Sequence, residues 1–154
     1  EKPETNKEDV LNSPEIEWPT ISVPGTIMRQ TKDSYDIIFE NGLFTSKTNL
    51  ADGAVQSLVK TIEAIKPFLL KFIIVVEGHT DSLPITSASS ILDNHALAMA
   101  RANIVMQIII NLSGVSPDSV YATSAGELYP PFPNSDEQSR LKNRTVILKL
   151  MPRK

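Results

Sequence analysis

The chain contains no cysteine, and only two of its 154 residues are histidine. The absence of cysteine excludes disulfide bonds, thiolate catalysis and zinc sites built on cysteine. It is compatible with any compartment, and slightly favours an oxidising one in which a stray thiol is a liability. Long apolar runs are missing too. The run FIIVV at 72–76 is far shorter than the roughly 20 residues that cross a membrane.

Basic patches are also absent from the sequence. The chain carries 15 Lys and Arg against 18 Asp and Glu, a formal net charge of −3. Nucleic acids and anionic lipids attract clustered Lys and Arg, and no basic stripe with interleaved aromatic residues occurs. We therefore expect no nucleic-acid partner.

The length suits one domain with a buried core, preceded by an arm. Residues 1–20 are charged, contain three prolines and show little apolar periodicity, which predicts a linker or loosely attached arm. Trp18 is the one large apolar group there that could hold the arm against the domain. The predicted domain spans 21–154.

Helices and strands alternate along this domain. Apolar residues at steps of three or four predict a helix from Leu50 to Ile65, stopped by Pro67, and a long one from Asp93 or Asn94 to about Leu112 with Gly114 beyond its end. Strands are predicted at 34–40, 71–77, 119–125 and 144–150, and 126–143 is predicted to be a loop. The order β-α-β-α-β-β predicts an α+β fold, a two-layer sandwich with a mixed sheet and helices on one face.

The segment VVEGHTDSLP at 75–84 places polar groups where a buried strand ends. His79 and Asp81 have the spacing of two metal ligands, but a metal site needs a third, and nothing in the pattern directs His95 towards them. No G-x-S-x-G motif accompanies the serines of the following loop. Glu77 and Asp81 would lie about 13 Å apart along a strand, too far for a glycosidase pair. We therefore expect neither metal binding nor hydrolysis.

Arg101 belongs to the inward-facing stripe of the second helix. A buried guanidinium requires a partner, because desolvating its charge is costly. We expect that partner to be Asp81, at the end of the neighbouring strand. The two could form a structural salt bridge, or a partly open pair that holds a zwitterion through its ammonium and carboxylate groups.

Three segments in the same order resemble a known family. They are IIVVEGHTD at 73–81, NHALAMARA at 94–102, and the stretch from Ser124 to Leu150 that contains GELYPPFP and KNRTVILKL. Together they resemble the OmpA C-terminal-like domain, the peptidoglycan-binding module of OmpA, Pal and MotB. The resemblance covers about residues 34–150. The residues Ser82-Leu83-Pro84 after Asp81 and the long insert before Asn94 look most like the MotB branch.

The resemblance implies a binding site for the diaminopimelate of the peptidoglycan stem peptide. Asp81 would take its ammonium and Arg101 its carboxylate. Thr80 and Asn94 would line the same pocket, Leu97 would form an apolar wall, and Arg144 matches the Arg of the last motif. The segment NGLF at 41–44 resembles one whose backbone forms the pocket rim. Ala98, Ser124 and Thr145 depart from the family pattern.

By resemblance we expect a non-catalytic domain without cofactor or metal. It would lie in the periplasm and anchor an attached inner-membrane protein, such as a flagellar stator subunit, to the cell wall. We also expect a homodimer and a membrane-embedded partner subunit, reached through a segment before Glu1. The alternative is an assembly or dimerisation module on the same fold that does not bind peptidoglycan.

Overall fold

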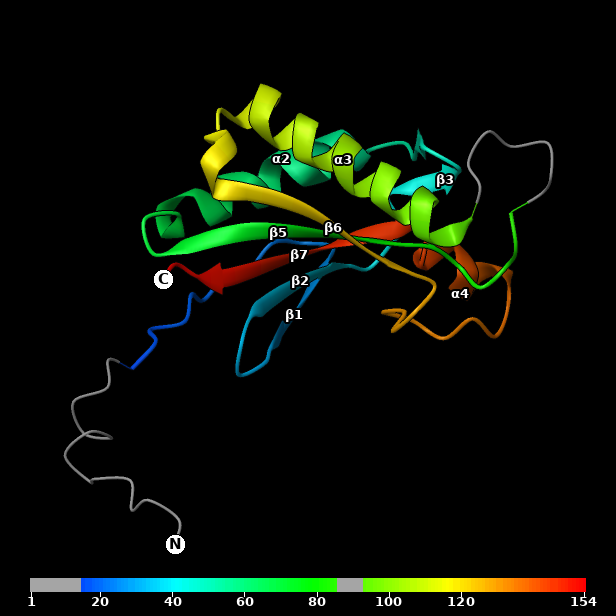
Figure 1. Ribbon diagram of the computed structural model, residues 1–154, viewed down its shortest axis with the longest axis horizontal. Coiled ribbons are helices and arrows are strands. Elements are labelled where there is room, and N and C mark those ends of the chain that lie inside the picture. Colours follow the sequence, from blue (N-terminus) through cyan, green and yellow to red (C-terminus); the bar gives the residue numbers. More distant parts are fainter. Residues whose placement is uncertain (1–14, 86–92) are drawn as a thin grey trace, which may run out of the picture.

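The computed structural model describes residues 15–85 and 93–154. The first fourteen residues of the predicted arm and positions 86–92 of the predicted polar loop lie outside the described part. At the start of that part, the ring of Trp18 packs on Phe72 with centroids 5.8 Å apart. This contact places Trp18 beside the first residue of strand β5. Figure 1 shows that the described chain begins at the end of the sheet where the C-terminus also lies.

A five-stranded mixed sheet forms one layer of the domain. Its order is β1-β2-β7-β5-β6; β5 and β6 are parallel, and the other neighbours are antiparallel. The strands are β1 (Thr26–Gln30), β2 (Tyr35–Phe39), β5 (Phe72–His79), β6 (Val120–Gly126) and β7 (Thr145–Pro152).

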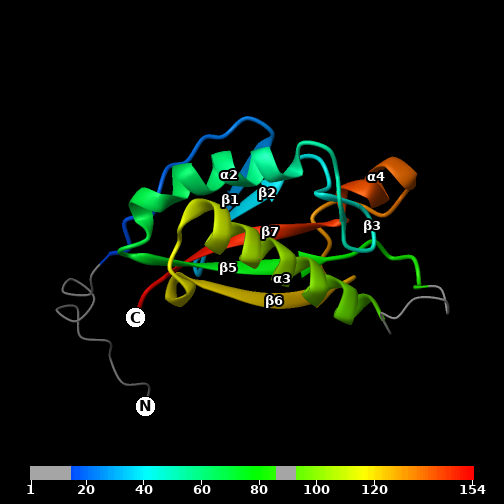
Figure 2. The same cartoon turned by 90° about the horizontal axis from the view of Figure 1, so that it is seen from above.

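Two helices form the other layer. Helices α2 (Ala54–Ile65) and α3 (Asn94–Ser113) lie on the same face of the sheet (Figures 1 and 2). The α+β sandwich predicted from the sequence is therefore confirmed. Its core joins Leu58 and Ile62 of α2, Val105 and Ile109 of α3, and Ile74, Val76 and Leu148 of the sheet.

Helix α3 has the length and apolar composition of a membrane-crossing helix, although a core helix passes the same test. Its buried face, which includes Leu97, Ala102 and Val105, packs against the sheet. Its ends follow the predicted signals: the Asp93 side chain accepts a hydrogen bond from the backbone N–H of Ala96, and Gly114 ends the helix with φ of 67°.

The backbones of α3 and β5 approach each other closely at Gly78. A Cβ atom at this position would lie 1.8 Å from the carbonyl oxygen of Ala98. Only glycine permits this contact, and it sets α3 directly over the end of β5. The sheet end that carries Thr80 and Asp81 therefore lies beside the first turns of the helix.

Four short elements were not predicted: strands β1, β3 and β4 and helix α4. Strands β3 (Phe44–Ser46) and β4 (Asn49–Leu50) form a small separate hairpin, so α2 begins at Ala54 and not at Leu50. Helix α4 (Glu137–Lys142) lies in the predicted loop, and its N-cap is Asp136, which accepts from the N–H of Ser139 at 2.8 Å. Two 3-10 turns, η1 (Lys66–Phe68) and η2 (Pro117–Ser119), complete the described part.

Candidate functional site

One cavity of about 300 Å³ brings together all six residues that the sequence nominated for ligand binding. It lies where β5 ends, between the first turns of α3, the β3–β4 hairpin and the start of β7. We call it the first cavity. Its nominated lining residues are Thr80, Asp81, Asn94, Leu97, Arg101 and Arg144.

Asp81 lies two residues after β5 and is 9% exposed. Its Oδ2 accepts from Nε of Arg144 at 2.8 Å, and its Oδ1 accepts from the backbone N–H of Leu83 at 3.0 Å. Each carboxylate oxygen has a second lone pair that can accept another donor. The carboxylate is thus held in a defined position while it lines the cavity.

Arg144 connects four parts of the site. Besides Asp81, its guanidinium donates to the carbonyl oxygen of Thr45 at 2.7 Å and to Glu137 at 3.1 Å. Its own carbonyl oxygen accepts from the N–H of Phe44 at 2.9 Å. Arg144 therefore ties the hairpin and α4 to the end of β5.

Arg101 is 2% exposed and stacks over the ring of Phe44, 5.3 Å from the centroid. Its Nε donates to the carbonyl oxygen of Lys47 at 2.7 Å, and Nη1 donates to that of His79 at 3.0 Å. Burial lowers the pKa of Arg101 to about 10, with Asp81 raising it and Arg144 lowering it further. The side chain nevertheless keeps its charge at neutral pH.

The expected direct pair between Asp81 and Arg101 is wrong. Asp81 pairs with Arg144, and among the described residues the hydrogen bonds of Arg101 go to two carbonyl oxygens. The register of β5 against β7 explains the difference, because His79 lies opposite Thr145. Arg144, the residue before Thr145, therefore lies beside the residues that follow His79, which include Asp81. Both arginines and the acid still line one cavity.

The remaining nominated residues shape the walls. Thr80 is 1% exposed; its N–H donates to the carbonyl oxygen of Gly126 and its hydroxyl to that of Asp81, both at 2.9 Å. The Asn94 amide donates to the carbonyl oxygen of Leu83 at 3.1 Å. Leu97, 7% exposed, supplies an apolar wall.

His79 does not reach the cavity. Its ring is fully buried, and its Nε2 lies 2.7 Å from Oε1 of Glu77, which also pairs with Lys149 at 3.3 Å. The hydrogen bond with His79 is the main cause of a lowered pKa at Glu77, reinforced by Lys149 and opposed by burial. Within 15–85 and 93–154, no three His, Asp or Glu side chains gather as metal ligands do.

Sequence reasoning missed the residues of the hairpin. Ser46 and Lys47 line the cavity, and the carbonyl oxygens of Thr45 and Lys47 hold the two arginines. The expected rim at 41–44 therefore lies too early in the chain, except that Phe44 contacts Arg101. A carbonyl oxygen belongs to the backbone, so no side-chain motif predicts that it will accept a hydrogen bond from an arginine. The only local signal is a short polar turn, in which Lys47 adopts a φ of 46°.

The fold and this site define a class of protein. A sequence model of the OmpA family matches residues 44–144, which include every nominated site residue. The chain belongs to the OmpA family, whose domains are peptidoglycan-binding modules of the cell envelope.

Solved structures of similar fold come from several bacterial envelope proteins. The periplasmic domain of Helicobacter pylori MotB is 23% identical, with 88% of each chain covered and a TM-score of 0.75. A putative MotB-like protein from Desulfovibrio vulgaris is 24% identical over 84% of this chain and 80% of that one, with a TM-score of 0.70. The cell wall anchor of the T6SS from Pseudomonas aeruginosa is 20% identical over 84% and 89%, with a TM-score of 0.66.

Proposed function

We propose that this domain binds peptidoglycan without catalysis and anchors an attached envelope protein, such as a MotB-like stator subunit, to the cell wall. The observation that carries the proposal is the first cavity, which gathers Asp81, Arg101 and Arg144 at one sheet end. Similarity to a periplasmic MotB domain and to a cell wall anchor supports the same reading.

The charges of the first cavity suit the free end of diaminopimelate, which carries an ammonium and a carboxylate on one carbon. Asp81 is the acceptor for the ammonium. Arg101 and Arg144, with Lys47 at the rim, provide a net positive environment for the carboxylate. Nη2 of Arg101 makes no hydrogen bond to any residue in the described ranges, so it is the donor we assign to that carboxylate.

The affinity for one stem peptide is expected to be modest. A hydrogen bond to a charged group contributes about 1.5–3 kcal/mol, and two or three of them offset the entropy lost on binding only in part. A domain of this kind therefore holds an envelope protein in place when several copies act on one polymer.

The proposal is tested by retention on purified sacculi. We expect the double variant Asp81→Ala, Arg101→Ala to lose most of the retention, and Arg101→Lys to lose much of it because an ammonium cannot replace the guanidinium fork. The matched control is Lys32→Ala, Asp33→Ala, which removes one exposed base and one exposed acid in the β1–β2 turn. Retention of the double variant equal to that of wild type, with both proteins folded by circular dichroism, would refute peptidoglycan binding at this site.

A second function, an assembly module, is favoured by one specific observation. The outer side of α3 carries an apolar groove of about 500 Å³ lined by Ile104, Ile108 and Leu112 among neutral amides, and Leu112 is 59% exposed. Such a surface is typical of sites that contact another protein. A homodimer, and a membrane-embedded partner subunit reached through an inner-membrane anchor, belong to this proposal. Sedimentation of wild type and Ile108→Lys would test the dimer: a monomer at all concentrations speaks against it.

A further inference from the structure

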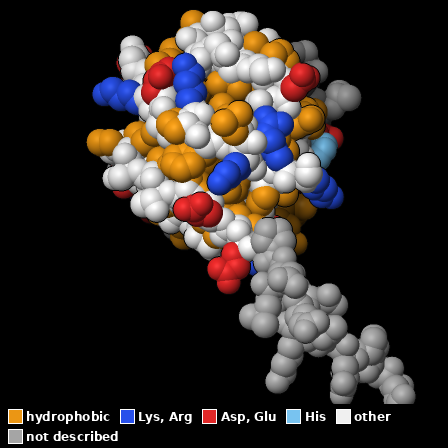
Figure 3. Space-filling model, turned by 90° about the vertical axis from the view of Figure 1, so that its left-hand side faces the viewer, with side chains coloured by type: hydrophobic (Ala, Val, Ile, Leu, Met, Phe, Trp, Pro, Cys, Tyr) orange, Lys and Arg blue, Asp and Glu red, His pale blue; other side chains and the backbone are white. Residues whose placement is uncertain are grey.

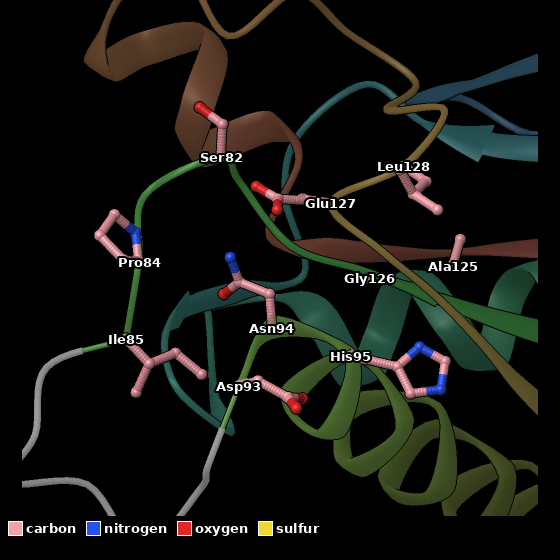
Figure 4. A pocket seen from close by; sticks show the side chains of 10 residues that line it. All are labelled: Ser82, Pro84, Ile85, Asp93, Asn94, His95, Ala125, Gly126, Glu127 and Leu128. Carbon is pink, nitrogen blue, oxygen red and sulfur yellow. The ribbon is translucent and has the colours of Figure 1, made fainter.

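A second cavity adjoins the first and has no role in the function proposed above. Its volume is about 540 Å³. It shares Pro84, Ile85 and Asn94 with the first cavity, so that the two are neighbours along the same groove. Figure 4 shows it between the first turn of α3 and the chain that follows β6, with further walls from Ser82, Asp93, His95 and Glu127.

The end of strand β6 forms one wall of the second cavity. Gly126 has a φ of 60°, and a Cβ there would lie 3.4 Å from Cα of His95, so the strand end lies directly over the start of α3. The Ser124 hydroxyl donates to the carbonyl oxygen of His95 at 2.7 Å. The carbonyl oxygen of Gly126 accepts from Thr80, which ties this wall to the residue before Asp81.

Asn94 lies between the two cavities and lines both. Its amide donates to the carbonyl oxygen of Leu83, so that it links the start of α3 to the loop after Asp81. In Figure 4 the side chains of Asn94 and Glu127 lie on facing sides of the second cavity. A ligand held by Asp81 and Arg101 that extends past Asn94 therefore enters the second cavity.

The two cavities differ in charge. Arg101, Arg144 and Lys47 outnumber Asp81 in the first. Among the described residues, the second is lined by Asp93 and Glu127 and by no Lys or Arg, and Oδ1 of Asp93 already accepts from the N–H of Ala96. Within the described ranges neither acid forms an ion pair. A carboxylate is therefore disfavoured here, and hydrogen-bond donors are favoured.

We propose that the second cavity is a further peptidoglycan subsite. It takes an uncharged, donor-bearing part of the polymer that lies next to the diaminopimelate end held in the first cavity. Such donors are the hydroxyl and acetamido groups of the amino sugars or the amide N–H groups of the stem peptide. Pro84, Ile85 and Leu128 provide the apolar contacts that a sugar ring or a peptide methyl group needs. This inference rests on the proposed function.

The test uses three probes of increasing length, followed by amide chemical shifts and by calorimetry. They are meso-diaminopimelate, the tripeptide L-Ala-γ-D-Glu-meso-diaminopimelate, and the same tripeptide on its disaccharide. Diaminopimelate is expected to shift only amides around the first cavity. A longer probe should also shift Ser82, His95 and Glu127 and bind about fivefold to tenfold more tightly, the gain of one or two hydrogen bonds. If the tripeptide already shifts these amides and binds more tightly, the group in the second cavity is a peptide amide. If only the tripeptide on its disaccharide has these effects, the group belongs to a sugar.

Glu127→Ala tests the second cavity separately, because Glu127 is exposed and its side chain makes no hydrogen bond or ion pair with another described residue. We expect this variant to lose the gain of the longer probe, about threefold to tenfold, and to bind diaminopimelate as wild type does. Asp33→Ala, which removes an exposed acid at the other end of the sheet, should change neither affinity.

The outcomes separate the two proposals. If diaminopimelate binds but the longer probes gain no affinity and shift no amide of the second cavity, the subsite is refuted and the proposed function stands. An equal loss for every probe in Glu127→Ala also refutes it, because Glu127 would then act on the first cavity. If no probe shifts the first cavity, the proposed function fails and the subsite fails with it.

Discussion

At the residue scale, the site depends on how the two arginines are held. Each donates to a backbone carbonyl oxygen of the hairpin, Arg101 to Lys47 and Arg144 to Thr45. Burial of Arg101 costs desolvation energy, which is why its pKa falls to about 10. The guanidinium fork offsets this cost with several directed bonds at once, and a lysine ammonium cannot reproduce that geometry.

A second residue-scale feature is the chain of contacts from Lys149 through Glu77 to His79. Gly78 faces α3, so the alternation of β5 places Glu77 and His79 on the opposite face of the sheet from the helices. The carbonyl oxygen of His79 accepts from Arg101. These contacts therefore fix the end of β5 from the face opposite the helices. That strand end supplies the carbonyl oxygen to which Arg101 donates.

The lowered pKa of Glu77 predicts how stability depends on pH. Its hydrogen bond with His79 favours the carboxylate in the folded state, so the stabilisation is present above the ordinary value of 4.5 and is lost as pH falls through the lower folded pKa. We expect Glu77→Gln to lower the free energy of unfolding by about 1–3 kcal/mol at pH 7. The difference from wild type should shrink as pH falls below 4.5.

Urea denaturation at a series of pH values measures this effect. The control is Glu63→Gln, which removes an acid that forms an exposed ion pair with Lys66 on the helical layer. A gap between Glu77→Gln and wild type that stays constant from pH 7 to pH 3 would contradict the assignment.

At the element scale, the site is assembled by the contact between β5 and α3 and by the β3–β4 hairpin. Gly78 allows α3 to lie directly on the strand, and this brings Arg101 within 3.0 Å of the carbonyl oxygen of His79. The hairpin closes the other side, with Ser46 and Lys47 in the cavity wall. Neither element forms the site without the other.

We expect Gly78→Ala to reduce both stability and ligand binding. The added methyl group would overlap the Ala98 carbonyl group, so α3 must move and carry Arg101 away from the strand end. Overpacking of this kind costs about 1–3 kcal/mol. Urea denaturation and titration with a muropeptide measure the two effects separately.

The matched control for this prediction is Gly25→Ala. Gly25 has a φ of 82°, and a Cβ there would meet no atom within 4 Å. This variant should lose stability through backbone strain alone and keep wild-type affinity. The role of Gly78 in placing Arg101 is wrong if both glycine variants bind equally well.

At the scale of the whole molecule, the described start of the chain and the two cavities lie at opposite ends of strand β5. Trp18 contacts the first residue of β5, whereas the cavities lie beyond its last residue, about 25 Å away for a strand of this length. Figure 3 shows the end of the molecule opposite the cavities, where acidic, basic and apolar side chains are interspersed. In the function proposed above, an envelope protein joined on the N-terminal side of residue 15 would be attached at the end of β5 away from the cavities.

This arrangement predicts that joining copies through the arm strengthens retention. A parallel two-stranded coiled coil fused before Glu1 should raise retention on sacculi by up to about 100-fold over the single domain, because the second contact becomes intramolecular. The same fusion of the Asp81→Ala, Arg101→Ala variant should gain nothing. Equal retention of the single and the fused wild-type domain would show that the cavities cannot engage one polymer together.

The sequence by itself determined the layers of the fold and nominated six of the residues that line the first cavity. Apolar periodicity and the signals at Asp93 and Gly114 gave the helices, and motif residues from three segments nominated six positions that line one cavity. These features are local, since each depends on residues within a few turns of one another. Strand β1, the hairpin at 44–50 and helix α4 were missed because short elements carry too few residues for a periodicity to appear.

Only the tertiary structure decided which groups meet. Asp81 and Arg144 are 63 residues apart, and the register of β5 against β7 joins them in place of Asp81 and Arg101. Backbone carbonyl oxygens accept hydrogen bonds from both arginines. Because every residue has such an oxygen, no side-chain pattern predicts that those of Thr45 and Lys47 are the acceptors. The second cavity likewise exists only because β6 crosses the start of α3. The sequence identifies the side chains of the site, whereas the paths of distant backbone segments determine which groups contact one another.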